Sequence, residues 1–274
     1  MVKFLITGQM RSGTTLLCNF LNSQPNITAW ADIFHSVAGK IPHPKGWHSS
    51  KINYNQNLPV TQRLYLLYTM SFGIDVLKKS NNVNYDMLFN PSQFNTVDEL
   101  YNILLDSISN ENDHAVGHKV TECELNIPSI LSQTDIKVIY IYRDVRDVVP
   151  SGNKKFNRNI KSSCLQWNKA IDIVSDINHT NFLMVKFEDL ISKDDDVKQK
   201  LNYMLNTTIS YQLNELYAYN NVFTANSSFN DIDSIFDENA IFRWENNSDK
   251  KLLNYINTLC HDRIVRAGYK PLEE

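Results

Sequence analysis

Short apolar runs alternate with longer amphipathic segments along this chain. The runs hold five or six residues each, are rich in β-branched and aromatic side chains, and are too short for helices. Continuous apolar runs of this kind are typical of strands buried on both faces of a sheet. We therefore predict about five buried strands, at Lys3–Thr7, Ala115–Val120, Lys137–Tyr142, Phe182–Phe187 and, more weakly, Ile27–Ala31.

Helical patterns fall between these runs, at Thr14–Asn22, Ser162–Asp176, Asp194–Leu205 and Ser248–Ala267. Ser248 is expected to cap the last helix, and Gly268 follows it where helices commonly end. Strands that alternate with helices favour an α/β fold, with helices on both faces of a central parallel sheet. We predict one domain over residues 1–274, built in three layers.

The segment from about 40 to 112 departs from this alternation. It contains a Pro/His/Gly-rich stretch, Ile41–Ser50, which we interpret as a loop, and a long helical candidate, Pro59–Lys79. We predict a mostly helical insertion over the carboxyl edge of the sheet, where open α/β folds bind ligands. Its many aromatic residues either line a pocket there or form a second small core.

Composition narrows the class of partner. The chain has 274 residues, 42% of them hydrophobic and 21% charged, with a net charge of −3. This charge argues against a nucleic-acid protein held by a global positive field, but permits a local basic pocket. No apolar run reaches the roughly 18 residues of a membrane span. The four cysteines form no CxxC pair, so we expect reduced thiols, no metal site and a cytoplasmic protein that binds no membrane.

The first run leads into Gly8-Gln-Met-Arg11-Ser-Gly13-Thr14-Thr15, which has the GxxxxG spacing of a phosphate loop. Glycines let successive N–H groups point at one anion beside the positive end of a helix. Thr14 stands where a nucleotide triphosphatase has lysine, and a cation, Arg11, lies inside the loop. The lack of this lysine argues against a magnesium-bound triphosphate as the ligand. The arginine inside the loop favours a ligand with one phosphate beside a second anionic group.

A second motif follows the strand Lys137–Tyr142. Arg143 stands at the end of this strand, and Ser151 follows eight residues later. An arginine at that edge is expected to point into the ligand crevice, where guanidinium and hydroxyl suit a phosphate monoester. The alternative is a surface Arg–Asp ion pair, which contributes little.

Together the two motifs resemble the sulfotransferases that use 3′-phosphoadenosine-5′-phosphosulfate (PAPS). The matching phrases are RSGTTL at 11–16, RDVRDVVPS at 143–151, ITAWADIFHS at 27–36, which is similar to the GExFH segment of bacterial members, VKFEDL at 185–190, and Arg243-Trp244 with a later AGYKP at 267–271. Leu16 stands where some animal members have tryptophan against the adenine, so the base must be held otherwise. The resemblance misses most of residues 40–112.

The resemblance implies a P-loop-like fold with five parallel strands, PAPS as donor, PAP as product and no metal. It implies that the loop holds the 5′-phosphate, that Arg11 neutralises the transferred sulfuryl group, and that a lid-like polar segment at about 220–247 covers the donor. By the same resemblance, the donor is bound by Arg11, Ser12, Gly13, Thr14, Thr15, Arg143, Ser151 and, on weaker grounds, Ser227 and Arg243.

Catalysis also needs a base for the acceptor proton. Asp32 takes the acidic position of the GExFH-like segment and is the leading candidate, with His35 second. Lys119 resembles a family lysine near the transferred group. The alternatives are a cap or a partner of Arg11 for Asp32, a structural role for His35 and a salt bridge for Lys119.

We therefore expect sulfuryl transfer from PAPS to a hydroxyl of a small molecule, as in secondary metabolism; an amine or carbamoyl nitrogen stays open. The aromatic insertion and an acidic run near residues 231–238 favour an aromatic or cationic acceptor. One rival is a kinase with a degenerate phosphate loop. Another is a non-catalytic module that binds adenosine bisphosphate.

Overall fold

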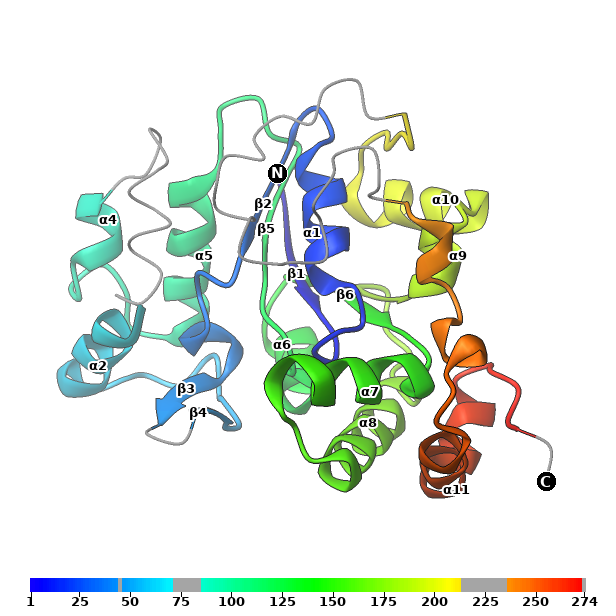
Figure 1. Cartoon of the computed structure of the whole chain (residues 1–274). Helices are drawn as coiled ribbons and strands as arrows, with labels where there is room; N and C mark the ends of the chain where they lie inside the picture. The colour runs from blue at the N-terminus through cyan, green and yellow to red at the C-terminus, as the bar shows by residue number, and fades with distance from the viewer. Residues whose placement is uncertain (44–45, 71–84, 213–235, 273–274) are drawn as a thin grey trace.

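A computed structural model describes residues 1–43, 46–70, 85–212 and 236–272 (Figure 1). Its centre is a parallel sheet with strand order β2-β5-β1-β6-β7. The predicted α/β class and all five predicted strands are confirmed, each within one residue at either end. The strands are β1 (Val2–Thr7), β2 (Ile27–Ala31), β5 (Ala115–Lys119), β6 (Lys137–Tyr142) and β7 (Phe182–Lys186).

Helices cover both faces of the sheet, as predicted for three layers. Side chains of β1 alternate between the faces: Leu5 packs in one core cluster, and Phe4 and Ile6 in the other. Helices α5 (Val97–Ile108) and α6 (Ile127–Gln133) contribute to the first cluster. The second cluster contains residues of α1 (Thr14–Asn22), α9 (Phe187–Ile191) and α10 (Asp195–Leu205).

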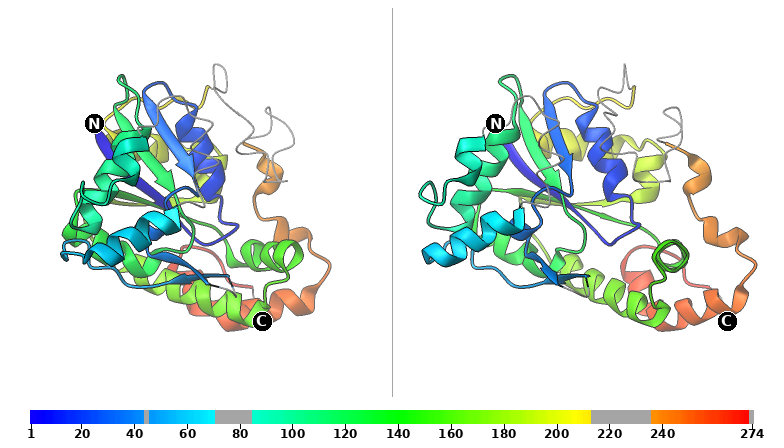
Figure 2. Two further views of the ribbon diagram at one scale, coloured as in Figure 1. Left: turned by 90° about the vertical axis from the view of Figure 1, so that its left-hand side faces the viewer. Right: turned by 60° about the vertical axis from the view of Figure 1, so that its left-hand side comes forward.

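A third cluster joins α7 (Val145–Phe156), α8 (Ile160–Ser175) and α11 (Lys250–Arg266) around the buried Trp167. Figure 2 shows α11 alongside α8 in both views. The predicted Ser248 cap of α11 is wrong: Asp249 is the cap, and its Oδ1 accepts a hydrogen bond from Leu252 N at 3.0 Å.

The segment after β2 differs from the prediction in one way. Ile41–Ser50 is not a loop, because β3 (Lys40–His43) and β4 (Gly46–Ser49) form an antiparallel hairpin. Helix α5, inside the predicted insertion, packs against β5 and contributes to the layer over the sheet. The predicted helix Pro59–Lys79 is present as α2 (Val60–Met70); its predicted end lies outside the described residues. The remaining short elements are α4 (Tyr85–Phe89) and the 3-10 helices at Ser36–Ala38, Glu124–Asn126, Glu238–Ala240 and Arg243–Asn246.

Among the described residues, no helix has the length and apolar character that a membrane crossing requires.

Candidate functional site

The carboxyl end of β1 opens into the predicted phosphate loop, and α1 starts directly after it. Gly13 has a φ of 97° and Arg11 a φ of 76°, so two residues of the loop are in left-handed conformations. For a non-glycine residue this backbone is strained, and such strain concentrates at functional sites. Helix α1 has no side-chain cap and no acidic residue in its first turn. Its positive end therefore suits an anion.

Two contacts fix the shape of this loop. A Cβ on Gly13 would lie 2.5 Å from the ring of Phe187, so only glycine fits there. The hydroxyl of Ser12 is buried and donates to the carbonyls of Gln9 and Ile141, at 2.7 and 3.0 Å. The Ser12 N–H is bonded to Gln9 O as well, at 3.1 Å. Ser12 thus helps to fix the shape of the loop, and its predicted contact with the donor stays a prediction.

The loop and the second motif meet at Arg11, whose Nε donates to Ser151 Oγ at 3.0 Å. Ser151 lies on α7, which begins after β6. Burial, followed by repulsion from Arg143 and Arg243, lowers the pKa of Arg11. Arg143 and Arg243 are therefore close enough to repel Arg11, although each of them is also paired with an aspartate. Such a concentration of positive charge is typical of an anion site.

Arg143 is buried, not at the surface as in the alternative considered from the sequence. Its Nη2 donates to Asp147 Oδ2 at 2.9 Å and to the carbonyl of Ala240, and its Cζ lies 4.3 Å from the ring centre of Phe187. Its Nε is buried without a partner among the described residues. Ser151, predicted beside Arg143, is instead bonded to Arg11. The unpaired N–H of Arg143 leaves one donor for a further acceptor.

The candidate base lies at the ends of two neighbouring strands. Asp32 follows β2, and Lys119 ends β5; Lys119 Nζ lies 2.6 Å from Asp32 Oδ2. The salt bridge considered for Lys119 is therefore present, and Lys119 is the partner of Asp32. The Lys119 side chain is 4% exposed and that of Asp32 is 48% exposed, so the carboxylate is accessible while its counter-ion is buried.

His35 lies beside this pair, with Nε2 3.6 Å from Asp32 Oδ1. Burial lowers the pKa of His35 to about 4, although Asp32 acts in the opposite direction. The imidazole is therefore neutral near pH 7 and able to accept a proton. Asp32, His35 and Lys119 therefore lie together, and their roles as candidate bases and as a lysine near the transferred group stay predictions.

Two further residues lie in this region, Glu122, which was missed from the sequence, and Trp47, one of the aromatic residues of the predicted insertion. Glu122 bonds through its N–H to Gly8 O at 2.9 Å, and its carboxylate pairs with Lys40 at 3.2 Å and Arg158 at 2.6 Å. Trp47 of β4 stacks on His35. Glu122 lies just beyond the carboxyl end of β5, a place where polar residues are often functional. That position was the available signal for Glu122, whereas the sequence marked Trp47 only as one of many aromatic residues and gave no indication of its contact with His35.

Of the two remaining predicted donor-binding residues, Arg243 is described by the structure and Ser227 is not. Arg243 begins a 3-10 helix, is exposed, and pairs with Asp237 at 3.2 Å. The backbone N–H of the next residue, Trp244, donates to Asp147 Oδ1 at 2.9 Å, which places this part of the predicted lid beside Arg143. Ser227 and two residues of the acidic run, Asp231 and Asp233, lie outside the described residues.

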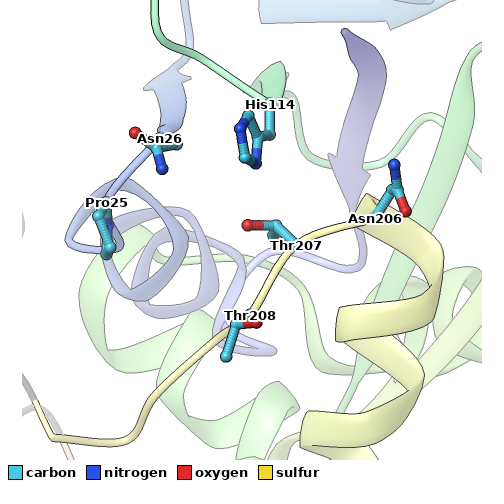
Figure 3. A pocket seen from close by; sticks show the side chains of 6 residues that line it. All are labelled: Pro25, Asn26, His114, Asn206, Thr207 and Thr208. Atoms are coloured by element: carbon cyan, nitrogen blue, oxygen red, sulfur yellow. The ribbon is translucent and has the colours of Figure 1, made fainter.

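A cavity of about 340 Å³ lies at the opposite, amino edge of the sheet (Figure 3). Its lining residues precede β2 and β5 or follow α10: Pro25, Asn26, His114, Asn206, Thr207 and Thr208. None of the predicted site residues belongs to this cavity.

Comparisons with known proteins establish the fold. No family model matches the chain, and neither does any curated protein. Among solved structures, the chain is similar to the sulfotransferase domain of the Synechococcus PCC 7002 olefin synthase, with a TM-score of 0.56 and 14% identity over 98% of this chain and 96% of that one. For the sulfotransferase domain from the curacin biosynthetic pathway the TM-score is 0.54 and the identity 15%, over 99% of both chains. For a mouse sulfotransferase complexed with PAP the TM-score is 0.51 and the identity 11%, over 98% of this chain and 89% of that one. The chain therefore has the fold of the sulfotransferases.

Proposed function

We propose that this protein is a sulfotransferase that moves a sulfuryl group from PAPS to a hydroxyl of a small molecule. The observation that carries the proposal is the hydrogen bond from Arg11 to Ser151. It joins the two motifs that were assigned to the two ends of one nucleotide, although 140 residues separate them in the sequence. The fold, shared with a sulfotransferase complexed with PAP, supports the same donor.

The residues present suit this donor at three points. The uncapped start of α1 offers the N–H groups of Gly13, Thr14 and Thr15 to a phosphate. Arg11 supplies a cation beside them, which stabilises negative charge that develops as the sulfuryl group leaves. Arg143 has a buried Nε–H without a partner among the described residues, suited to the 3′-phosphate, while its Nη2 donates to Asp147 and Ala240. When bound, PAPS supplies the activated sulfuryl group.

The acceptor proton is proposed to go to Asp32, whose half-exposed carboxylate is reachable from solvent. Lys119 holds this carboxylate in place and stabilises its charge. His35, neutral and adjacent, is the second candidate for the same step. An amine or carbamoyl nitrogen can replace the hydroxyl without a change in these roles.

The first experiment measures transfer of labelled sulfate from PAPS to a panel of small-molecule hydroxyl and amine acceptors. We expect Arg11→Ala to abolish transfer, because it removes the cation at the reacting group. Arg266→Ala is a matched control on the surface of α11 and is expected to leave transfer intact. Normal turnover in Arg11→Ala would remove the proposed role. Magnesium-dependent ATP turnover without a response to PAPS would favour the kinase, and tight PAP binding without any transfer would favour the binding module.

A second experiment separates the two candidate bases. Asp32→Asn and His35→Gln keep similar shapes and remove one proton acceptor each. We expect Asp32→Asn to lower kcat by about 10²–10⁴-fold, the usual contribution of a general base. A loss of that size in His35→Gln alone would transfer the role to His35.

A further inference from the structure

The hairpin β3–β4 covers His35, the second candidate for the base. On β4, the indole of Trp47 lies over the imidazole of His35, with ring centres 4.4 Å apart and planes inclined by 16°. The indole is 42% exposed, whereas the His35 side chain is 18% exposed. Trp47 is thus the outer ring of the stack and His35 the inner one.

The other groups around His35 have charges of both signs. Asp32 lies 3.6 Å away and favours a protonated imidazole, while Lys119 and Lys40 disfavour it. His118, buried on β5, lies close enough to interact electrostatically as well. Desolvation outweighs all of these and is the main reason for the low pKa of His35. The protonation of His35 therefore depends chiefly on whatever keeps water away from it.

We infer that Trp47 is a positioning residue, whose indole holds the His35 imidazole beside Asp32 and excludes water, so that His35 stays neutral. The role in proton transfer rests on the proposed function, but the effect on His35 itself does not. The hairpin thereby becomes part of the acceptor side of the site. It is held there by Lys40, at the start of β3, which pairs with the buried Glu122 beside the phosphate loop.

Two physical effects of the indole oppose each other. An aromatic face attracts a cation, which would favour the protonated imidazole. Exclusion of water disfavours the protonated form and can shift a buried group by several pKa units. The inference requires exclusion of water to be the larger effect. The direction in which the titration midpoint of His35 moves when the indole is removed decides between the two effects.

The test follows the imidazole by NMR as the pH changes, with the His35 signal assigned from His35→Gln among the seven histidines. In the unaltered protein we expect His35 to titrate near its pKa of about 4. Trp47→Ala admits water and is expected to move the midpoint upward, toward the ordinary 6.5. Trp47→Phe keeps a flat ring and is expected to stay close to the unaltered protein. Trp47→Gln removes the ring but keeps a longer side chain, is expected to move the midpoint upward as well, and preserves the test if the alanine variant does not fold.

Tyr203→Ala removes an aromatic ring that is 84% exposed on α10, and is the matched control with no expected shift. An unchanged or lowered midpoint in Trp47→Ala, or an equal shift in Tyr203→Ala, would overturn the inference. These titrations use no donor or acceptor, so their outcome is independent of whether the protein transfers sulfate. Where transfer is observed, the acidic limb of kcat/KM should move to higher pH in Trp47→Ala, while PAP affinity by calorimetry stays unchanged.

Discussion

At the scale of single residues, Gly13 is where the geometry of the phosphate loop is most tightly constrained. Gly13→Ala adds a left-handed strain of about 1–2 kcal/mol and a methyl group 2.5 Å from Phe187. Gly268→Ala adds similar strain at a φ of 76° with nothing within 4 Å, and is the matched control. Together with a typical overpacking cost of about 1–3 kcal/mol, this strain is expected to lower the free energy of unfolding of Gly13→Ala by about 2–5 kcal/mol. We also expect Gly13→Ala to weaken PAP binding. Equal losses in both variants, measured by urea unfolding, would show that Phe187 yields without cost.

The two members of the Asp32–Lys119 pair differ in burial, so we expect their replacement to have unequal effects on stability. Asp32→Asn leaves a buried ammonium group without its counter-ion, whereas Lys119→Met leaves a carboxylate that water can reach. We expect Asp32→Asn to destabilise the fold by about 2–3 kcal/mol and Lys119→Met by less than about 1 kcal/mol, within the range measured for coupled residues. The double variant should be close to Lys119→Met. Urea unfolding of all three checks this, and the reverse order of losses would contradict the pairing.

Residue types alone indicated much of this site, but not its pairing. Gly13, Arg11 and Ser151 stand in motifs whose spacing has a direct physical meaning, and the structure brings the latter two together. Arg143 was assigned to a ligand, yet its contacts include the carbonyl of Ala240, 97 residues away. Contacts of that kind depend on how distant loops return to the sheet, which a local pattern does not encode.

At the scale of elements, the ion triad of Glu122, Lys40 and Arg158 ties the hairpin to the phosphate loop and to the end of α7. Burial alone would raise the pKa of Glu122, but Lys40 and Arg158 together outweigh it and lower that pKa below 4.5. A carboxylate whose pKa is lower in the folded than in the unfolded state stabilises the folded state at pH values above its unfolded-state pKa. That stabilisation is lost as the pH falls through the folded pKa.

Glu122→Gln should therefore cost about 3 kcal/mol of unfolding free energy at pH 7, as expected when a buried pair loses one partner. The difference from the unaltered protein should shrink as the pH falls below about 4.5. Asp195→Asn removes an exposed carboxylate paired with Lys198 and is the control, with an expected loss under about 1 kcal/mol. Urea unfolding from pH 3 to pH 7 measures both; a pH-independent loss in Glu122→Gln would exclude the ionic explanation.

The elements also show where a sequence pattern is informative. Strands β1, β2, β5 and β6 are largely buried and the edge strand β7 is half-buried, so each forms a short, mostly apolar run that is easily recognised. The hairpin β3–β4 is only two four-residue strands containing Pro, His and Gly, types that usually mark loops. The cap of α11 was misplaced by one residue because Ser248 and Asp249 are both good caps, and only the bond to Leu252 distinguishes them.

At the scale of the whole molecule, the proposed donor should link the two halves of the chain. PAP would contact the loop after β1 and the region around Arg143, which also contacts the segment 236–247 through Ala240. A ligand held by parts so distant in the sequence stabilises the entire folded state against unfolding. At 100 times its dissociation constant this amounts to about 2.7 kcal/mol, or roughly 5–10 °C in Tm for a chain of this size.

We therefore expect PAP and PAPS to raise Tm by several degrees, with ATP and GTP at equal concentration giving little shift. ATP lacks the 3′-phosphate assigned to Arg143, and the loop lacks the lysine that suits a triphosphate. In Arg11→Ala the PAP shift should shrink, because the cation at one end of the nucleotide is lost, whereas Arg266→Ala should keep it. A larger shift with ATP than with PAP would contradict the assignment of both motifs, since each was matched to a nucleotide with phosphates at two separate positions. An equal shift in Arg11→Ala would instead mean that the uncapped start of α1 holds the 5′-phosphate without that cation.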